Sequence, residues 1–189
     1  MRALIIVDVQ NDFCAGGAVP VIGAETVARR ISGYADSAAA RVRYNHVVAT
    51  QDWHIDPGAH FAEHPNFQHS WPPHCVAGSP GADFSPALNC RHIEAIFKKG
   101  SYSAGYSGFS GIEAQGIALA DWLHQQQVND VDVVGVATEH CVRATALDAV
   151  RAGFGTRVLV PLTAAVSAAS AAIALADLRR AGVAVMETV

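Results

Sequence analysis

The sequence is poor in cysteine and has no cluster of like charge, and each shortage excludes a class of protein. Its four cysteines among 189 residues form no CxxC pair, and the chain is too long and too apolar for a disulfide-dense secreted scaffold. The net charge of −4 comes without any lysine or arginine cluster, which argues against nucleic acid or an anionic membrane as partner. We therefore expect reduced thiols, a small-molecule partner and a cytoplasmic location.

Long hydrophobic runs are also absent. The first apolar stretch, Ala3–Val7, is shorter than the apolar core of a signal peptide, and no run approaches the length of a membrane-spanning helix. No linker, repeat or low-complexity tract divides the chain, and 51% of its residues are hydrophobic, enough for a well-buried core. We expect one α/β domain over residues 1–189, as a monomer or a small homo-oligomer with no membrane partner.

Glycine is missing where a nucleotide-binding domain would need it. The first apolar run leads into Val9–Phe13, which lacks the glycines that allow a backbone to approach a pyrophosphate, and no P-loop occurs in the chain. A nucleotide-binding module is therefore disfavoured.

Short apolar runs alternate with helical patterns along the chain. Most of the runs are continuously apolar, as expected for parallel strands that are covered on both faces. The expected strands are Ala3–Val7, His46–Thr50, Ile93–Phe97, Val131–Val136, Arg157–Leu162 and Val183–Met186. The expected helices are Ala24–Ala40, Ala114–Gln127, Cys141–Ala152 and Ser170–Ala181. This alternation predicts a three-layer α/β fold, with a doubly wound, mainly parallel sheet and helices on both faces.

Reactive side chains follow four of the expected strands. Asp8 comes after the first strand, Asp52 after the second, Lys99 after the third and Cys141 after the fourth. Because open α/β sheets bind ligands beyond the carboxyl ends of their strands, we expect these four residues at one rim of the sheet. Neighbours on a strand point to opposite faces, so only one of Lys98 and Lys99 is expected to reach the site.

Cys141 lies where an apolar run changes into a helical pattern. Unpaired N–H groups and the positive end of a helix dipole at such a position favour a thiolate. Asp8 can accept the thiol proton as a general base, and the ammonium of Lys99 can stabilise both anions while the thiolate attacks an acyl carbon. The alternative for Cys141, taken alone, is a small buried packing residue.

A second cluster begins in the long irregular segment Gln51–Asn89, which is rich in His, Pro and Trp. Loops of this length inside a compact domain are usually functional. Asp52 and His54 are two residues apart on an extended chain and project from the same side, while His60 and His74 return on the loop. One carboxylate and three imidazoles suit Zn, Fe or Mn. A merely polar loop, or a metal-binding protein without catalysis, are the alternatives.

These motifs occur in an order that resembles a known family. The segments are Ile5–Phe13, Asp52–His60, Ser70–Cys75, Phe97–Gly100 and Gly135–Val142, and the similarity extends from Met1 to about Val160. They resemble the nicotinamidase/pyrazinamidase family of isochorismatase-like cysteine hydrolases. Trp53 and Lys98 are modest departures from the family pattern.

The resemblance implies a parallel six-stranded sheet and assigns roles to the motif residues. The implied catalytic triad is Asp8, Lys99 and Cys141, and the implied ligands of one divalent metal ion are Asp52, His54, His60 and His74. The implied substrate-binding residues are Phe13, Trp71, Tyr106, Ala137 and His140. A structural hydrogen bond is the alternative role of His140.

The resemblance also implies the backbone geometry and the reaction. A cis peptide bond is implied between Val136 and Ala137, and the N–H groups of Ala137 and Cys141 would form the oxyanion hole. The implied activity converts nicotinamide to nicotinate and ammonia through a cysteine thioester, and pyrazinamide to pyrazinoate, as a step of NAD salvage. Another small amide or isochorismate is the alternative substrate, but a vinyl ether such as isochorismate needs no thiol nucleophile.

Overall fold

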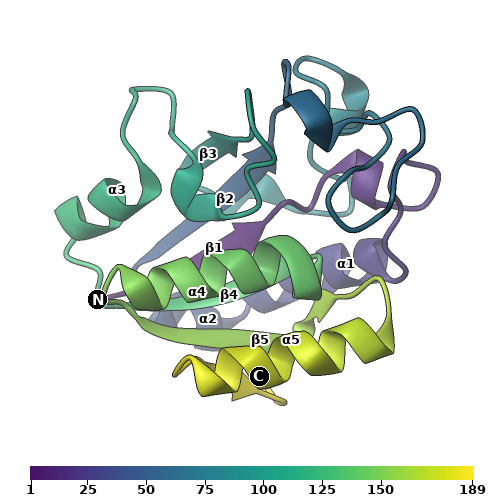
Figure 1. Cartoon of the computed structure of the whole chain (residues 1–189). Coiled ribbons are helices and arrows are strands. Elements are labelled where there is room, and N and C mark those ends of the chain that lie inside the picture. The colour runs from purple at the N-terminus through teal and green to yellow at the C-terminus, as the bar shows by residue number, and fades with distance from the viewer.

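Six strands form one sheet in which every neighbouring pair is parallel. The computed structural model describes all of residues 1–189. The strands are β1 (Arg2–Val7), β2 (His46–Asp52), β3 (Ala95–Lys99), β4 (Asp130–Val136), β5 (Gly155–Ala164) and β6 (Ala184–Met186). Their order in the sheet is β3-β2-β1-β4-β5-β6, so the chain winds from β1 to one edge and then to the other (Figure 1). The predicted doubly wound sheet is confirmed.

Helices cover both faces of this sheet. Residues Leu4 and Ile6 of β1 pack into a core with α1, whereas Ala3, Ile5 and Val7 pack into a second core with α3, α4 and α5. The α-helices are α1 (Ala24–Ala35), α2 (Ala38–Arg43), α3 (Leu119–Gln125), α4 (Arg143–Arg151) and α5 (Ala168–Arg180). Figure 1 shows α4 and α1 on opposite sides of the sheet. The continuous apolar runs of the strands thus reflect burial on both faces.

Single helical turns occur in the connections. The 3₁₀ turns are Asn11–Phe13, Gly58–His60, Pro80–Ala82, Cys90–His92 and Gly108–Ser110, and a π-helical turn spans Thr138–Val142. None of the helices has both the length and the apolar character that crossing a bilayer requires.

The helix expected over Ala24–Ala40 is divided into α1 and α2. The division occurs at Ser37, whose backbone is extended and whose hydroxyl accepts a hydrogen bond from the Ala40 N–H at 3.1 Å. Serine is favoured at such a capping position because its oxygen satisfies an N–H group at the start of a helix. The prediction of one continuous helix was therefore wrong.

The boundaries of other elements also differ from the prediction, most of all at α3. Helix α3 begins at Leu119 rather than Ala114, because the Glu113 carboxylate accepts the N–H groups of Gln115 and Ile117 at 2.9 Å each and holds a turn there. Strand β3 begins two residues after Ile93 and continues through Lys99, where its last residue pairs with Asp52 of β2.

The long segment after β2 is irregular, as predicted, and lies beyond the carboxyl ends of β1 and β2 (Figure 1). An isolated bridge pairs Phe84 of this segment with Gln10, and another pairs His54 with Val76 within the segment. The histidine-rich loop is thereby held beside the segment that follows Asp8.

Candidate active site and metal centre

Asp8, Lys99 and Cys141 lie together at the carboxyl end of the sheet. The Lys99 Nζ is 2.8 Å from Asp8 Oδ2 and 3.7 Å from the Cys141 Sγ. All three residues are buried, with exposed fractions of 0%, 1% and 5% for Asp8, Lys99 and Cys141. Lys98 is exposed, so the alternation along β3 selects Lys99 as expected. The structure therefore brings together the three residues that the sequence predicts to be catalytic.

Local backbone geometry directs Asp8 into this cluster. Asp8 follows β1 with a φ of 49°, a left-handed conformation that turns the chain away from the sheet. Its Oδ1 accepts a hydrogen bond of 2.6 Å from the hydroxyl of Thr50 on β2. Thr50 was not predicted as part of the site, because only the pairing of β1 with β2 reveals that the two side chains meet.

Cys141 is carried by the π-helical turn Thr138–Val142 that connects β4 to α4. Before this turn, Gly135 has a φ of 115°, and a Cβ there would lie 2.1 Å from the Val7 carbonyl oxygen, so only glycine fits. The Val136–Ala137 peptide bond is cis, in agreement with the resemblance. Cys141 therefore lies within a π-helical turn, two residues before α4 begins, rather than at the first position of that helix.

Burial is the largest single influence on the pKa of each of the three groups, although the nearby carboxylates together outweigh it at Lys99. Burial raises the pKa of the Cys141 thiol well above its ordinary value, and the Lys99 ammonium only partly opposes the rise. Burial also raises the pKa of the Asp8 carboxyl, again against Lys99. For Lys99 itself, burial acts to lower the pKa, but the carboxylates of Asp52 and Asp8 raise it well above its usual value. These directions favour a charged Lys99 and a protonated Cys141 thiol, in contrast to the thiolate expected from a helix terminus.

Asp52 lies between this cluster and the histidines. Its Oδ1 is 2.5 Å from the Lys99 Nζ, and its Oδ2 is 3.8 Å from the Nε2 of His54. The Asp52 side chain is 5% exposed and faces both groups. One carboxylate therefore links the lysine to the imidazole cluster.

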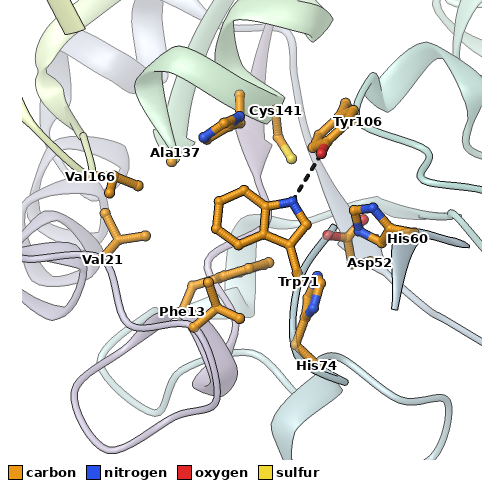
Figure 2. A pocket seen from close by; sticks show the side chains of 12 residues that line it. Phe13, Val21, Asp52, His60, Trp71, His74, Tyr106, Ala137, Cys141 and Val166 are labelled. Carbon is orange, nitrogen blue, oxygen red and sulfur yellow. Dashed lines mark hydrogen bonds between the residues drawn. The ribbon is translucent and has the colours of Figure 1, made fainter. Parts of the chain in front are cut away.

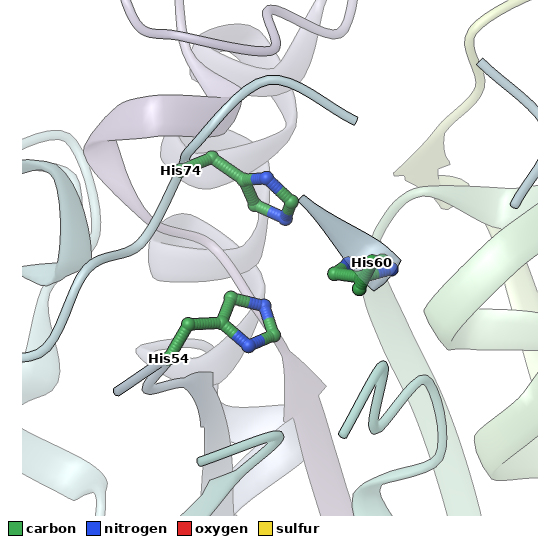
Figure 3. A group of neighbouring side chains, drawn as sticks. All are labelled: His54, His60 and His74. Carbon is green, nitrogen blue, oxygen red and sulfur yellow. The ribbon is translucent and has the colours of Figure 1, made fainter. Parts of the chain in front are cut away.

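His54, His60 and His74 converge as three buried imidazoles (Figure 3). One nitrogen from each ring lies within 4.8 Å of the other two. The Nδ1 of His54 is 2.6 Å from the Gly100 carbonyl, and the Nδ1 of His74 is 2.8 Å from the Pro72 carbonyl. Because a carbonyl only accepts, both Nδ1 atoms must carry hydrogen, which leaves each Nε2 lone pair free to bind a metal.

His54 and His60 fit a metal ion by charge as well as by geometry. The buried His54 Nε2 and His60 Nδ1 have no hydrogen-bond partner within the protein. Burial lowers the pKa of His54, and burial together with His74 and His54 lowers the pKa of His60 to about 4. Neutral, unpaired ring nitrogens are the form in which histidine binds metals. The cluster is therefore a candidate site for a divalent metal ion.

Gly100 is a determinant of this centre that the sequence did not reveal. Its φ is 74°, and a Cβ there would lie 2.6 Å from the Cε1 of His54, so glycine is needed for its carbonyl to approach the ring. The two departures from the family pattern lie outside the centre and contact each other, with the Lys98 Nζ 3.3 Å from the centroid of the Trp53 ring.

A pocket opens beside Cys141 and next to the metal centre (Figure 2). Its lining residues are Phe13, Val19, Val21, Asp52, His60, Trp71, His74, Tyr106, Ala137, His140, Cys141 and Val166. Figure 2 shows Val21 and Val166 at the end away from Asp52 and His60. The pocket therefore has an apolar end and a polar end, with the sulfur between them.

All five residues predicted to bind substrate line this pocket. The Trp71 Nε1 donates a hydrogen bond of 3.0 Å to the Tyr106 hydroxyl. The His140 ring stacks on Tyr106 at a centroid distance of 5.9 Å and meets Trp71 edge-on at 5.3 Å. Val19, Val21 and Val166 were not predicted, because valines in loops carry no chemical signal until the fold places them.

The chain is similar to a protein family and to several known proteins. The isochorismatase domain model matches residues 2–189. The nicotinamidase/pyrazinamidase of Mycobacterium tuberculosis is 58% identical over 183 residues, which cover 97% of each chain. PnC1 from L. infantum in complex with nicotinate superposes with a TM-score of 0.86 at 38% identity, covering 98% of this chain and 92% of that one. Pyrazinamidase of Pyrococcus horikoshii in complex with zinc superposes with a TM-score of 0.83 at 34% identity, covering 98% of both chains. The chain belongs to the isochorismatase domain family.

Proposed function

We propose that the protein is a cysteine amidohydrolase that converts nicotinamide to nicotinate and ammonia, and pyrazinamide to pyrazinoate. The observation that carries the proposal is the Cys141 sulfur, which lies 3.7 Å from the Lys99 ammonium and lines a largely apolar pocket. The family relationship supports the choice of substrate, because the 58% identical relative is a nicotinamidase/pyrazinamidase and the L. infantum structure holds nicotinate. This activity would serve NAD salvage.

The pocket suits a flat aromatic amide. Phe13, Trp71 and Tyr106 offer ring surfaces to the substrate ring, and the polar end of the pocket offers an anchor for a ring nitrogen. Ala137 and His140 line the pocket beside the sulfur, where the carboxamide would lie. A hydrolase of another small amide is the second candidate, since the same pocket would accept other planar rings of similar size.

Asp52, His54, His60 and His74 would hold one divalent metal ion. One carboxylate and three imidazoles suit zinc, iron or manganese, and zinc is supported by the zinc complex of the Pyrococcus horikoshii pyrazinamidase. When bound, the ion supplies a positive charge that attracts a ring nitrogen or a water molecule.

In the first half of the reaction, Asp8 accepts the proton of the Cys141 thiol as the sulfur attacks the carboxamide carbon. The raised pKa of both groups suits this transfer, because the proton moves between two buried groups that Lys99 keeps close together. The N–H groups of Ala137 and Cys141 would stabilise the oxyanion of the tetrahedral intermediate. The protonated Asp8 then gives its proton to the amide nitrogen, the C–N bond breaks, and ammonia leaves.

In the second half, water hydrolyses the thioester. Asp8, again a carboxylate, accepts a proton from the water as its oxygen attacks the thioester carbon. The C–S bond breaks, the acid product forms, and the proton on Asp8 returns to the sulfur. The side chains thereby recover their starting protonation states.

An ammonia-release assay on nicotinamide and pyrazinamide, with elemental analysis of the same preparation, tests the substrate and the metal together. The Cys141→Ala variant should release no ammonia while its metal content stays unchanged, because the sulfur is not a proposed ligand. Substantial turnover by this variant would refute the thioester route.

The four cysteines form no disulfide in the structure, which supports our expectation of a cytoplasmic enzyme.

A further inference from the structure

Gln10 has a fully buried side-chain amide that takes no part in the proposed reaction. Its exposed fraction is 0%. Its Oε1 accepts a hydrogen bond of 2.9 Å from the Asp52 N–H, and its Nε2 donates one of 2.8 Å to the Asp52 carbonyl oxygen. The Nε2 also donates to the Ala82 carbonyl at 2.9 Å. Both backbone polar groups of Asp52 are therefore bound by one side chain.

The path of the chain explains why a side chain is needed there. The last residue pair between β1 and β2 is Val7 with Thr50, and the chain then leaves the sheet at Asp8, where φ is 49°. Asp52, two residues further along β2, has no β1 backbone beside it, although it is only 3% exposed. Buried N–H and C=O groups need partners, and a glutamine amide offers the same donor and acceptor as a peptide group. Gln10 thus continues the ladder in place of β1.

We infer that Gln10 is a positioning residue: it holds Asp52 where its carboxylate can pair with Lys99 and bind the metal ion at the same time. The Asp52 oxygens lie 2.5 Å from the Lys99 Nζ and 3.8 Å from the His54 Nε2, so any shift of the Asp52 backbone changes both distances. The inference rests on the proposed function in one respect, the role of Asp52 as a metal ligand. Supporting groups of this kind typically change metal affinity by about 10–100-fold when removed.

Gln51 provides a matched control within the same structure. It is the neighbour of Asp52, is 6% exposed, and donates its Nε2 to the same Ala82 carbonyl at 3.2 Å. Gln51→Met therefore removes a buried amide from the same region without removing either hydrogen bond to Asp52. Gln10→Met removes both of those bonds while keeping a side chain of similar length.

The test measures Co²⁺ binding to the metal-free proteins by absorption spectroscopy, with folding of each variant checked by circular dichroism. We expect Gln10→Met to bind Co²⁺ about 10–100-fold more weakly than the unsubstituted protein, with altered visible bands. Gln51→Met should keep the affinity and the bands of the unsubstituted protein. With nicotinamide and saturating metal, Gln10→Met should lower kcat more than it changes KM, because Asp52 also holds Lys99.

Unchanged Co²⁺ affinity and bands in folded Gln10→Met would overturn the inference, as would an equal loss of affinity in Gln51→Met. If Gln10→Met does not fold, Gln10→Asn makes the same comparison, since it keeps the amide but is one methylene too short to span Asp52. The titration contains no substrate, so its result stands even if the unsubstituted protein fails to hydrolyse nicotinamide. A lack of Co²⁺ binding by the unsubstituted protein would also count against the inference.

Discussion

Replacing Lys99 with methionine should destabilise the metal-free protein strongly. The substitution keeps most of the aliphatic side chain but removes an ammonium that lies 2.8 Å from Asp8 and 2.5 Å from Asp52. The side chains of these carboxylates are 0% and 5% exposed, so water cannot replace the lost charge. Removing one partner of a buried ion pair typically costs about 3–5 kcal/mol, because the remaining charge stays buried without compensation.

This loss is a large share of the stability of a typical domain, which is about 5–15 kcal/mol. For a chain of this length it corresponds to a fall in Tm of about 6–20 °C. Urea unfolding of the metal-free proteins at pH 7, followed by circular dichroism, measures the loss directly. Metal must be removed first, because a bound cation would stabilise Asp52 and mask the effect.

Lys98→Met is the matched control, since it removes the same chemical group from the adjacent residue. The Lys98 ammonium is exposed and packs over the Trp53 ring, a contact worth about 0.5–1 kcal/mol. We therefore expect a clear difference between the two variants. Equal free energies of unfolding for Lys99→Met and Lys98→Met would show that the buried carboxylates do not depend on the lysine, and would refute the reasoning.

Three further predictions concern other parts of the molecule. Asp132 is fully buried, and although burial acts to raise its pKa, hydrogen bonds from Arg157 and other partners hold that pKa below its usual value. Its contribution to the free energy of unfolding is thus present above pH about 4 and is lost as the pH falls through the lowered pKa. Asp132→Asn should lower the free energy of unfolding by about 2–3 kcal/mol at pH 7, and by progressively less at acid pH, as measured by urea unfolding. His54→Ala should lower the metal content and ammonia release together, and full activity with a normal metal content by elemental analysis would contradict the proposed ligand. Gly135→Ala should prevent folding or lower the Tm severely in thermal unfolding, because its Cβ would meet the β1 backbone. Gly182→Ala is the control: Gly182 has a φ of 88° and open space around it, so this substitution should lower the stability by only about 1–2 kcal/mol.

The site illustrates how one carboxylate can serve two neighbouring groups. Asp52 contacts Lys99 through one oxygen and faces His54 through the other. A metal ion and the Lys99 ammonium would therefore share Asp52 as a counter-ion, and a change in charge at either one should affect the other. Metal removal is accordingly expected to affect the catalytic cluster as well as the metal centre, which paired measurements of activity and bound metal would detect.

The motif residues could be located from the sequence because parallel strands end at a common edge. Asp8, Asp52, Lys99 and Cys141 each follow an apolar run, so a parallel arrangement was enough to bring them to one rim. The alternation along a strand limited the site to one of Lys98 and Lys99. The resemblance to the family supplied what spacing alone left open, including the substrate-binding residues and the cis peptide bond.

Other parts of the site depend on contacts between distant segments. Thr50, Gly100 and Gln10 support Asp8, His54 and Asp52, yet each acts through a hydrogen bond to a partner more than 40 residues away in the chain. Gln10 and Gly100 lie within motif segments, but the sequence assigned no role to them or to Thr50.

The amino-acid sequence by itself determined the alternation of strands and helices, the two-sided burial of the sheet and the identity of the reactive side chains, because these follow from periodicity and residue chemistry. The tertiary structure alone decided the ionisation of those side chains. A helix terminus taken in isolation favours a thiolate, but burial raises the pKa of Cys141 in the folded protein. Burial is a property of the packed molecule, and no short stretch of sequence contains it.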